Sequence, residues 1–240
     1  ALVLGRADPY ASSLSRDALQ NVRVGVLRQH DPTPNSSEAK LYQRALKLLK
    51  EQGAVLVDIE DIPGLGRIQR LEWSLLLREF RREINRYLAN TPREVESRTL
   101  TEVMAFNVAN TEQVMPHFDQ EIFELSEQTS ESDEPDLDTL ARQLKKLAGP
   151  EGIDALLQQA NCEILIAPTF GRPWKIDLAN GDNFEGSSCT TLPSVSGYPH
   201  LTVPMGLADG LPFGLSFIGT AFSESTLLSA GYAFEQARID

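Results

Sequence analysis

Short apolar runs along the chain predict five β-strands. In the first run Val22, Val24 and Val26 alternate with other residues, as expected of a strand that buries one face. The last two runs flank the turn at residues 208–210, where an Asp-Gly pair favours a hairpin because glycine accepts a positive φ. The predicted strands are residues 22–28, 54–59, 163–167, 200–205 and 213–218.

Apolar residues at helical spacing predict helices between these runs. Residues 36–52 are expected to form a helix that Ser36 or Ser37 caps and that Gly53 ends. A longer helix is expected at residues 68–89, with an apolar stripe facing a core and arginines on a solvated edge. The stripe is Trp73, Leu76, Leu77, Phe80, Ile84, Tyr87 and Leu88, and the edge is Arg78, Arg81, Arg82 and Arg86. Shorter helices are expected at residues 99–115, 118–126 and 137–157, the last interrupted near Gly149 and Pro150.

The order of these elements predicts an α/β fold. Strand, helix and strand follow one another over residues 22–59, and this order favours a right-handed crossover between parallel strands. The hairpin at residues 200–218 would make the sheet mixed, with α-helices on its faces. No convincing domain boundary is visible, and the acidic residues 127–138 are expected to form a solvated linker on the surface of a single domain.

Composition and charge limit the classes of partner. A formal net charge of −12 argues against binding nucleic acid or an anionic membrane, both of which need a basic surface. No run approaches the roughly 20 apolar residues of a membrane span. The first ten residues lack the basic and apolar regions of a signal peptide, and Cys162 and Cys189 are too few for a disulfide framework. A reducing compartment, the cytoplasm, is therefore expected.

The segment 167–184, APTFGRPWKIDLANGDNF, carries the densest set of candidate binding groups. It follows a predicted strand as a long irregular loop, and loops that leave strand ends in α/β sheets commonly carry ligand-binding side chains. The candidates are Trp174, Asp177, Asn180 and Asp182. A structural interpretation also remains open, in which Asp177 caps a turn formed by Asn180 and Gly181 while Trp174 packs.

Two patterns in the chain resemble the amidase signature family, particularly its peptide-amidase-like branch. Within residues 192–219, a G-x-P-x-x-x-V-P run is followed by G-L-P-x-G-L-x-F-x-G. Upstream of it, A-P-T precedes W-x-x-D-x-x-N-G-D-x-F, and every named position is met. The matching residues are Gly197, Pro199, Val203 and Pro204, then Gly210, Leu211, Pro212, Gly214, Leu215, Phe217 and Gly219, and in the upstream run Trp174, Asp177, Asn180, Gly181, Asp182 and Phe184.

The resemblance implies an amide hydrolase that cleaves a carboxamide C–N bond through a seryl acyl-enzyme. In that family the catalytic lysine and two serines lie upstream of the position where this chain starts, and residues 1–4 resemble the helix that follows them. We therefore expect the C-terminal half of one such domain, inactive alone, which contributes scaffold and a pocket wall. Trp174 and Phe184 would contact an apolar part of the substrate, and Asp177 or Asp182 would orient its polar groups.

This expectation also names partners and an alternative function. The complete enzyme would bind a small-molecule amide, and an exposed strand edge would be covered by the missing N-terminal half or by self-association. The alternative is a non-catalytic binding or interaction domain that retains the fold. An upstream reading frame with a lysine and a Gly/Ser-rich segment would indicate a fragment, and co-purification would reveal a split protein whose catalytic half is a separate chain.

A local nucleophile is the remaining catalytic alternative. Residues 186–189, Gly-Ser-Ser-Cys, form the Gly/Ser segment that could imitate a nucleophile loop. His200 with Asp177 or Asp182 could complete a serine triad on paper, but Thr190 stands where a nucleophile elbow has its second glycine. The cysteine of this segment has no basic sequence neighbour that would lower its pKa.

Metal and cofactor motifs are not indicated. His30, His117 and His200 are isolated in sequence, without the spacing of a metal-binding pair. The chain contains neither a phosphate-binding G-x-x-x-x-G-K-[ST] motif nor a complete dinucleotide fingerprint. We therefore expect no metal site and no cofactor.

Overall fold

The computed structural model describes residues 10–130, 132–133, 135–184 and 186–239. Residues 1–4, which resemble a helix in the sequence, lie outside the described residues, as do Glu131 and Glu134 of the expected linker. The chain forms two compact units. As far as these ranges are described, the first unit comprises residues 1–68, 145–174 and 184–240, and the second comprises residues 69–144 and 175–183.

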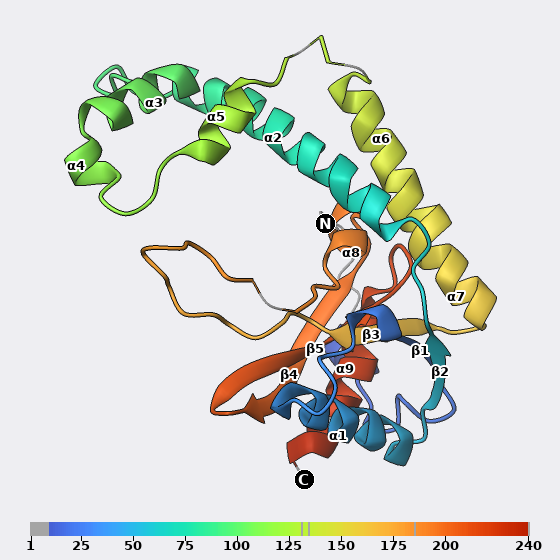
Figure 1. Ribbon diagram of the computed structural model, residues 1–240. Helices are drawn as coiled ribbons and strands as arrows, with labels where there is room; N and C mark the ends of the chain where they lie inside the picture. Colours follow the sequence, from blue (N-terminus) through green and yellow to red (C-terminus); the bar gives the residue numbers. More distant parts are fainter. Residues whose placement is uncertain (1–9, 131, 134, 185, 240) are drawn as a thin grey trace. The chain divides into compact units, whose positions relative to one another are not determined.

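A five-stranded mixed sheet forms the centre of the first unit (Figure 1). Its order is β2-β1-β3-β5-β4, in which β1 is parallel to β2 and β3, while β5 is antiparallel to β3 and β4. The strands are β1 (Arg23–Leu27), β2 (Val55–Ile59), β3 (Ile164–Pro168), β4 (His200–Ala208) and β5 (Leu211–Ile218). The predicted α/β fold, its parallel crossover and its hairpin are therefore confirmed.

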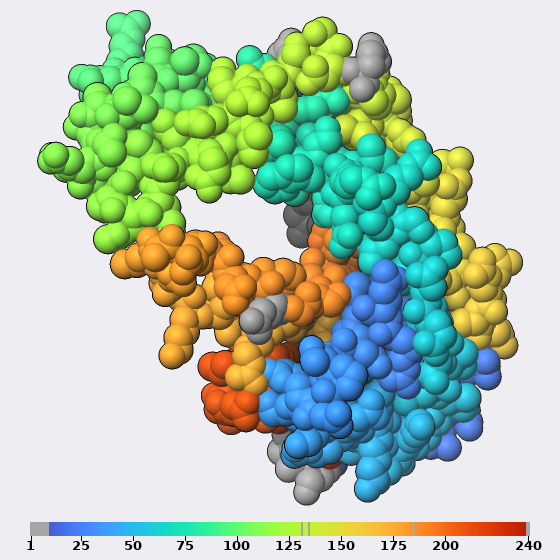
Figure 2. Space-filling model, in the orientation of Figure 1, coloured from blue at the N-terminus to red at the C-terminus, as the bar shows by residue number. Residues whose placement is uncertain are grey.

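Helices α1 (Ser37–Glu51) and α9 (Glu224–Ile239) pack on one face of this sheet. A 3-10 turn, η1 (Tyr10–Ser13), contacts α9. Every second strand residue faces these helices, because successive side chains of a strand point to opposite faces. Their shared core includes Val24, Val26, Ile164, Ile166, Leu215, Phe217, Tyr42, Leu49 and Phe234. In the space-filling view the blue surface of α1 borders the orange-red residues of the β4–β5 hairpin (Figure 2).

The ends of α1 lie where the sequence predicts them. The Ser36 hydroxyl accepts a hydrogen bond from the Ala39 amide at 3.0 Å and thereby caps the first turn. After the last turn Gly53 adopts a φ of 86°, a left-handed conformation that ends the helix and that glycine adopts without a steric penalty.

Within the first unit, the short helix α7 (Ala155–Ala160) contacts β1 and β2. Helix α6 (Leu137–Ala148) continues through a π-helical stretch, η3 (Gly149–Asp154), into α7 (Ala155–Ala160). The interruption predicted near Gly149 is thus a change of helical winding. Helix α8 (Thr191–Ser196) was not predicted, because six residues containing Pro193 show no recognisable helical period.

The second unit is helical. Its elements are α2 (Leu65–Ala89), which enters it at Gln69, followed by α3 (Leu100–Ala109), α4 (Thr111–Val114), α5 (Glu121–Glu127) and residues 137–144 of α6. Thr99 and Glu102 form a capping box that begins α3. The single helix predicted at residues 99–115 is divided, because the chain leaves helical geometry at Asn110.

The predicted apolar stripe of α2 is only partly correct. Trp73 and Tyr87, expected to face a core, are 47% and 67% exposed. Arg78, expected on a solvated edge, is instead buried and donates hydrogen bonds to the carbonyl oxygens of Pro135 at 2.8 Å and Asp133 at 3.0 Å. Periodicity identifies the helix, but it cannot show that a distant polar segment returns to cover an arginine.

Candidate functional site

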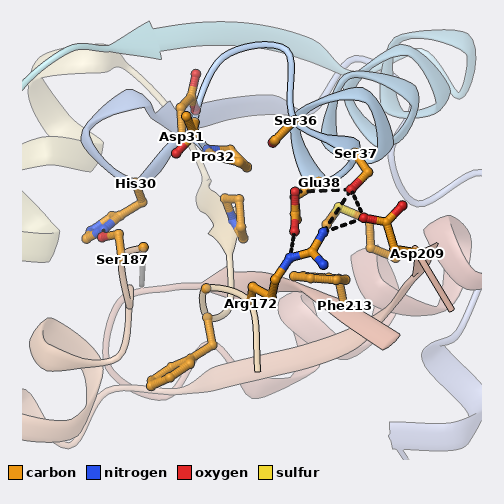
Figure 3. A pocket seen from close by; sticks show the side chains of 16 residues that line it. His30, Asp31, Pro32, Ser36, Ser37, Glu38, Arg172, Ser187, Asp209 and Phe213 are labelled. Atoms are coloured by element: carbon orange, nitrogen blue, oxygen red, sulfur yellow. Dashed lines mark hydrogen bonds and ion pairs between the residues drawn. The ribbon is translucent and has the colours of Figure 1, made fainter. Parts of the chain in front are cut away.

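Loops at the carboxyl ends of β1 and β3 border a cavity of about 520 Å³ in the first unit (Figure 3). Ligand sites of α/β sheets commonly form at this edge. The 3-10 turn η2 (Arg28–His30) leads away from β1, and residues 168–172 leave β3. The polar groups that line the cavity include His30, Asp31, Glu38, Arg172, Ser187 and Asp209.

Arg172 connects three parts of the cavity wall. Its Nε donates to a carboxylate oxygen of Glu38, and its Nη2 donates to Ser37 Oγ at 3.0 Å and to Asp209 Oδ2 at 2.6 Å. Ser37 Oγ donates in turn to Asp209 Oδ2 at 2.7 Å. Because Ser37 and Glu38 begin α1 and Asp209 lies in the hairpin turn, Arg172 fixes the loop after β3 to both elements.

The same cluster sets the charge of the cavity wall. Burial raises the pKa of Glu38, but hydrogen bonds from Arg172, from the backbone and from Ser36 outweigh it and leave that pKa below its usual value. Hydrogen bonds from Arg172 and Ser37 lower the pKa of Asp209. Two ionised carboxylates therefore face one guanidinium, and the cluster does not favour an anionic ligand.

His30 and Ser187 form a second polar contact in this cavity, with Nδ1 2.6 Å from Oγ. Burial lowers the pKa of His30, so the ring is neutral at pH 7 and can accept the serine proton. A histidine base is normally oriented by a carboxylate on its other ring nitrogen. Within the described part of the chain no carboxylate is hydrogen-bonded to His30, so this pair has only two members of a triad.

The local triad considered from sequence is wrong. His200 does not pair with the serines at residues 187–188, because its Nε2 lies 2.6 Å from Ser216 Oγ. The hydroxyl of Ser188 contacts that of Thr190 at 2.8 Å. Burial raises the pKa of the Cys189 thiol, which makes this cysteine a poor nucleophile.

The five predicted substrate contacts divide between the two units. In the first unit, Trp174 and Phe184 meet edge to face with ring centroids 5.6 Å apart, and Phe170 packs against Phe184 at 5.0 Å. In the second unit, the Asp177 carboxylate accepts hydrogen bonds from the Asn180 amide side chain at 2.8 Å and from the backbone of the same turn. Asp182, also in that unit, is exposed. The aromatic pair therefore faces solvent as a cluster, while Asp177 and Asn180 stabilise their own turn.

Sequence reasoning missed Arg172, Glu38 and Asp209. Arg172 is 134 residues from Glu38 and 37 from Asp209, so their pairing depends on the completed sheet. A lone arginine after a predicted strand was the available signal. No described group of three or more His, Cys, Asp or Glu side chains could hold a metal ion. Among the described residues no helix is both long and apolar enough to cross a membrane.

The chain resembles proteins of known class along nearly its whole length. Residues 3–228 match the family model described as Amidase. A probable amidase of Arabidopsis thaliana is 28% identical over 236 residues, which are 96% of this chain and 41% of that protein.

Solved structures of peptide amidases are similar to this chain in both sequence and fold. The native peptide amidase of Stenotrophomonas maltophilia is 36% identical, with a TM-score of 0.82 over 97% of this chain and 46% of that one. A peptide amidase bound to the competitive inhibitor chymostatin is 37% identical, with a TM-score of 0.83 over 97% of this chain and 47% of that one. This chain thus spans less than half the length of these relatives. It belongs to the amidase family.

Proposed function

We propose that this chain contributes the sheet scaffold and one wall of the substrate pocket to an amide hydrolase, and that it does not hydrolyse amides by itself. The observation that carries the proposal is the match of residues 3–228 to the Amidase family in a chain that spans 41% to 47% of its relatives. The substrate would be a small molecule with a carboxamide group, cleaved at its C–N bond through a seryl acyl-enzyme. The catalytic groups would come from the remaining part of such an enzyme.

The aromatic cluster supports a role in substrate binding. Phe170, Trp174 and Phe184 are 43%, 37% and 47% exposed, although they pack against one another. Rigid aromatic side chains that stay partly exposed at a loop can bury an apolar ligand group at small entropic cost. These rings would contact the apolar portion of the substrate. For the second unit taken by itself, the proposal is that Asp177 or Asp182, on the turn with Asn180, would orient polar groups of a substrate.

The polar contacts support the absence of independent catalysis. A serine hydroxyl becomes a nucleophile only when a base removes its proton. No lysine within the described ranges is hydrogen-bonded to a serine, and two of the lysines, Lys47 and Lys146, form ion pairs with glutamates. Ser187 has a histidine neighbour, but that histidine lacks an orienting carboxylate among the described residues.

Ammonia release from a panel of carboxamides tests this proposal. We expect the purified chain to release none above the rate of uncatalysed hydrolysis. The matched variants Ser187→Ala and Ser188→Ala separate the two serines of the candidate loop. Hydrolysis by the wild-type chain that disappears in either variant would overturn the proposal.

Two further expectations belong to the same proposal. β2 and β4 are the edges of the described sheet, and Val55 on β2 is 43% exposed, so we expect the chain to bind the remaining part of such an enzyme or to self-associate. A stable monomer on sizing would contradict this. We also place the protein in the cytoplasm, because Cys162 and Cys189 are both free thiols.

A non-catalytic binding domain is the alternative function. Both functions allow an inactive chain that binds ligands. They differ in the outcome of a chimera with an active relative, because a domain that has lost its amidase role would not complete a working enzyme.

A further inference from the structure

We propose that the hydroxyl of Thr169 donates a hydrogen bond to the carbonyl oxygen of a neutral ligand held in an apolar recess, and that Ser216 and His200 position this hydroxyl. The inference rests on the proposed amide-binding function and names a polar contact within it. Thr169 directly follows β3, the strand whose carboxyl end borders the larger cavity.

The recess has a volume of about 350 Å³, at the lower end of the range for small-molecule sites. Its walls are mainly aromatic rings, prolines and glycine backbone, including Phe170, Trp174 and Phe213. Its polar side-chain groups are the hydroxyls of Thr169 and Thr202 and the indole N–H of Trp174, and none of the described lining residues is charged. A neutral ligand with one ring and one hydrogen-bonding group fits this lining.

The Thr169 hydroxyl ends a chain of short hydrogen bonds. Ser216 Oγ donates to Thr169 Oγ1 at 2.8 Å, and His200 Nε2 lies 2.6 Å from the same Ser216 oxygen. Ser216 is fully buried, whereas Thr169 reaches the recess. Buried polar side chains connected in this way hold one another in a fixed orientation.

The number of protons on these groups determines which group donates in each of these hydrogen bonds. A hydroxyl has one proton, so when Ser216 donates to Thr169 it must accept from His200, which requires the Nε2–H tautomer. Burial lowers the pKa of His200, and a neutral imidazole carries its proton on one nitrogen only. The Thr169 proton is then left for another acceptor. Thr202 Oγ1 is 3.4 Å away, a long contact that a ligand carbonyl could improve.

The strand pairing explains why these groups meet. Thr202 and Ser216 are direct partners across β4 and β5, and both alternate with residues that face the apolar core. Gly214 leaves the room that Thr169 needs, because a β-carbon there would lie 2.8 Å from Thr169 Oγ1 and 2.5 Å from Thr202 Cγ2. The side chains of Thr202 and Ser216 therefore lie on the sheet face opposite α1 and α9.

Calorimetric titration with phenylacetamide and phenylthioacetamide tests the proposal. The two ligands share shape and charge, but sulfur accepts a hydrogen bond more weakly than oxygen. Thr169→Val removes the hydroxyl at nearly constant volume, and Thr169→Ser keeps it. We expect Thr169→Val to weaken phenylacetamide binding about fivefold, the effect of one neutral hydrogen bond, and to affect the thioamide much less. Thr169→Ser should restore the preference for the carbonyl.

Ser216→Ala separates positioning from simple structural support. It should reduce the preference for phenylacetamide over the thioamide and change the ring ¹⁵N shifts of His200, which report its tautomer. The proposal would be overturned if Thr169→Val and Ser216→Ala weakened the binding of both ligands by the same factor. It would also be overturned if the wild-type chain bound neither ligand. Binding is measured without turnover, so these outcomes are independent of the ammonia assay that tests the proposed function.

Discussion

Asp154 connects the π-helical stretch to both ends of the β4–β5 hairpin, and we expect its replacement by alanine to destabilise the first unit. Its Oδ2 accepts a hydrogen bond from the Tyr198 hydroxyl at 2.8 Å, and its Oδ1 accepts one from Thr220 Oγ1 at 2.6 Å. Tyr198 precedes β4 and Thr220 follows β5, so one carboxylate holds the strand ends beside His200.

The expected size follows from the surroundings of the two hydrogen bonds. A hydrogen bond to a charged group contributes roughly 1.5–3 kcal/mol, and solvent reduces this at the surface. The Tyr198 bond is partly buried and that of Thr220 is exposed, so we assign about 1.5 and about 0.5 kcal/mol. Asp154→Ala should therefore lower the free energy of unfolding by about 2 kcal/mol.

Urea unfolding followed by circular dichroism measures this change. Tyr198→Phe and Thr220→Val should each lower the free energy of unfolding by the amount assigned to the hydrogen bond that the variant removes. Asp61→Ala, at an exposed aspartate of the same unit, serves as the control. A loss for Asp154→Ala no larger than that for Asp61→Ala would refute the reasoning. So would a Thr220→Val effect larger than that of Tyr198→Phe.

Two further predictions concern the core and the buried histidines. Phe217 is fully buried, so Phe217→Ala should lower the free energy of unfolding by about 3–5 kcal/mol, whereas Phe222→Ala, at an 84% exposed ring, should change it by less than about 0.5 kcal/mol. Equal effects in urea unfolding would contradict the assigned core. Burial lowers the pKa of His30 and His200 below 6.5, so the unfolded chain binds their protons more readily and stability should fall as the pH drops below about 6.5. The variant His30→Gln/His200→Gln should lose this dependence in unfolding measured at several pH values, and an unchanged slope would count against it.

The positions of the strands could be predicted because the sequence signals that mark them are local. Alternating valines mark β1, and the Asp-Gly turn sets the hairpin whose strands then pair from Ala208 and Leu211 onward. The cap at Ser36 and the stop at Gly53 are likewise properties of single residues. Such local signals indicate where the strands lie and where α1 begins and ends, but they did not predict the strand order β2-β1-β3-β5-β4, the division of residues 99–115 or helix α8.

The site was predictable only as a region. The loop after β3 was identified, but the pairing of Arg172 with Glu38 and of His30 with Ser187 joins residues more than 130 positions apart. Only the folded sheet brings these loops to one edge. The prediction of which α2 side chains are exposed was partly wrong for a related reason. Helical periodicity indicates an apolar stripe, but it does not show whether another segment covers that stripe.

The central claim is that this chain is the scaffold and pocket-wall portion of an amide hydrolase. A chimera tests it most directly: this chain replaces the region that it matches in the peptide amidase of Stenotrophomonas maltophilia, and ammonia release from a peptide amide is measured. We expect the chimera to release ammonia, while this chain alone releases none. A chimera that is folded by circular dichroism but inactive on every amide tested would contradict the claim and favour a binding domain that has lost its catalytic role.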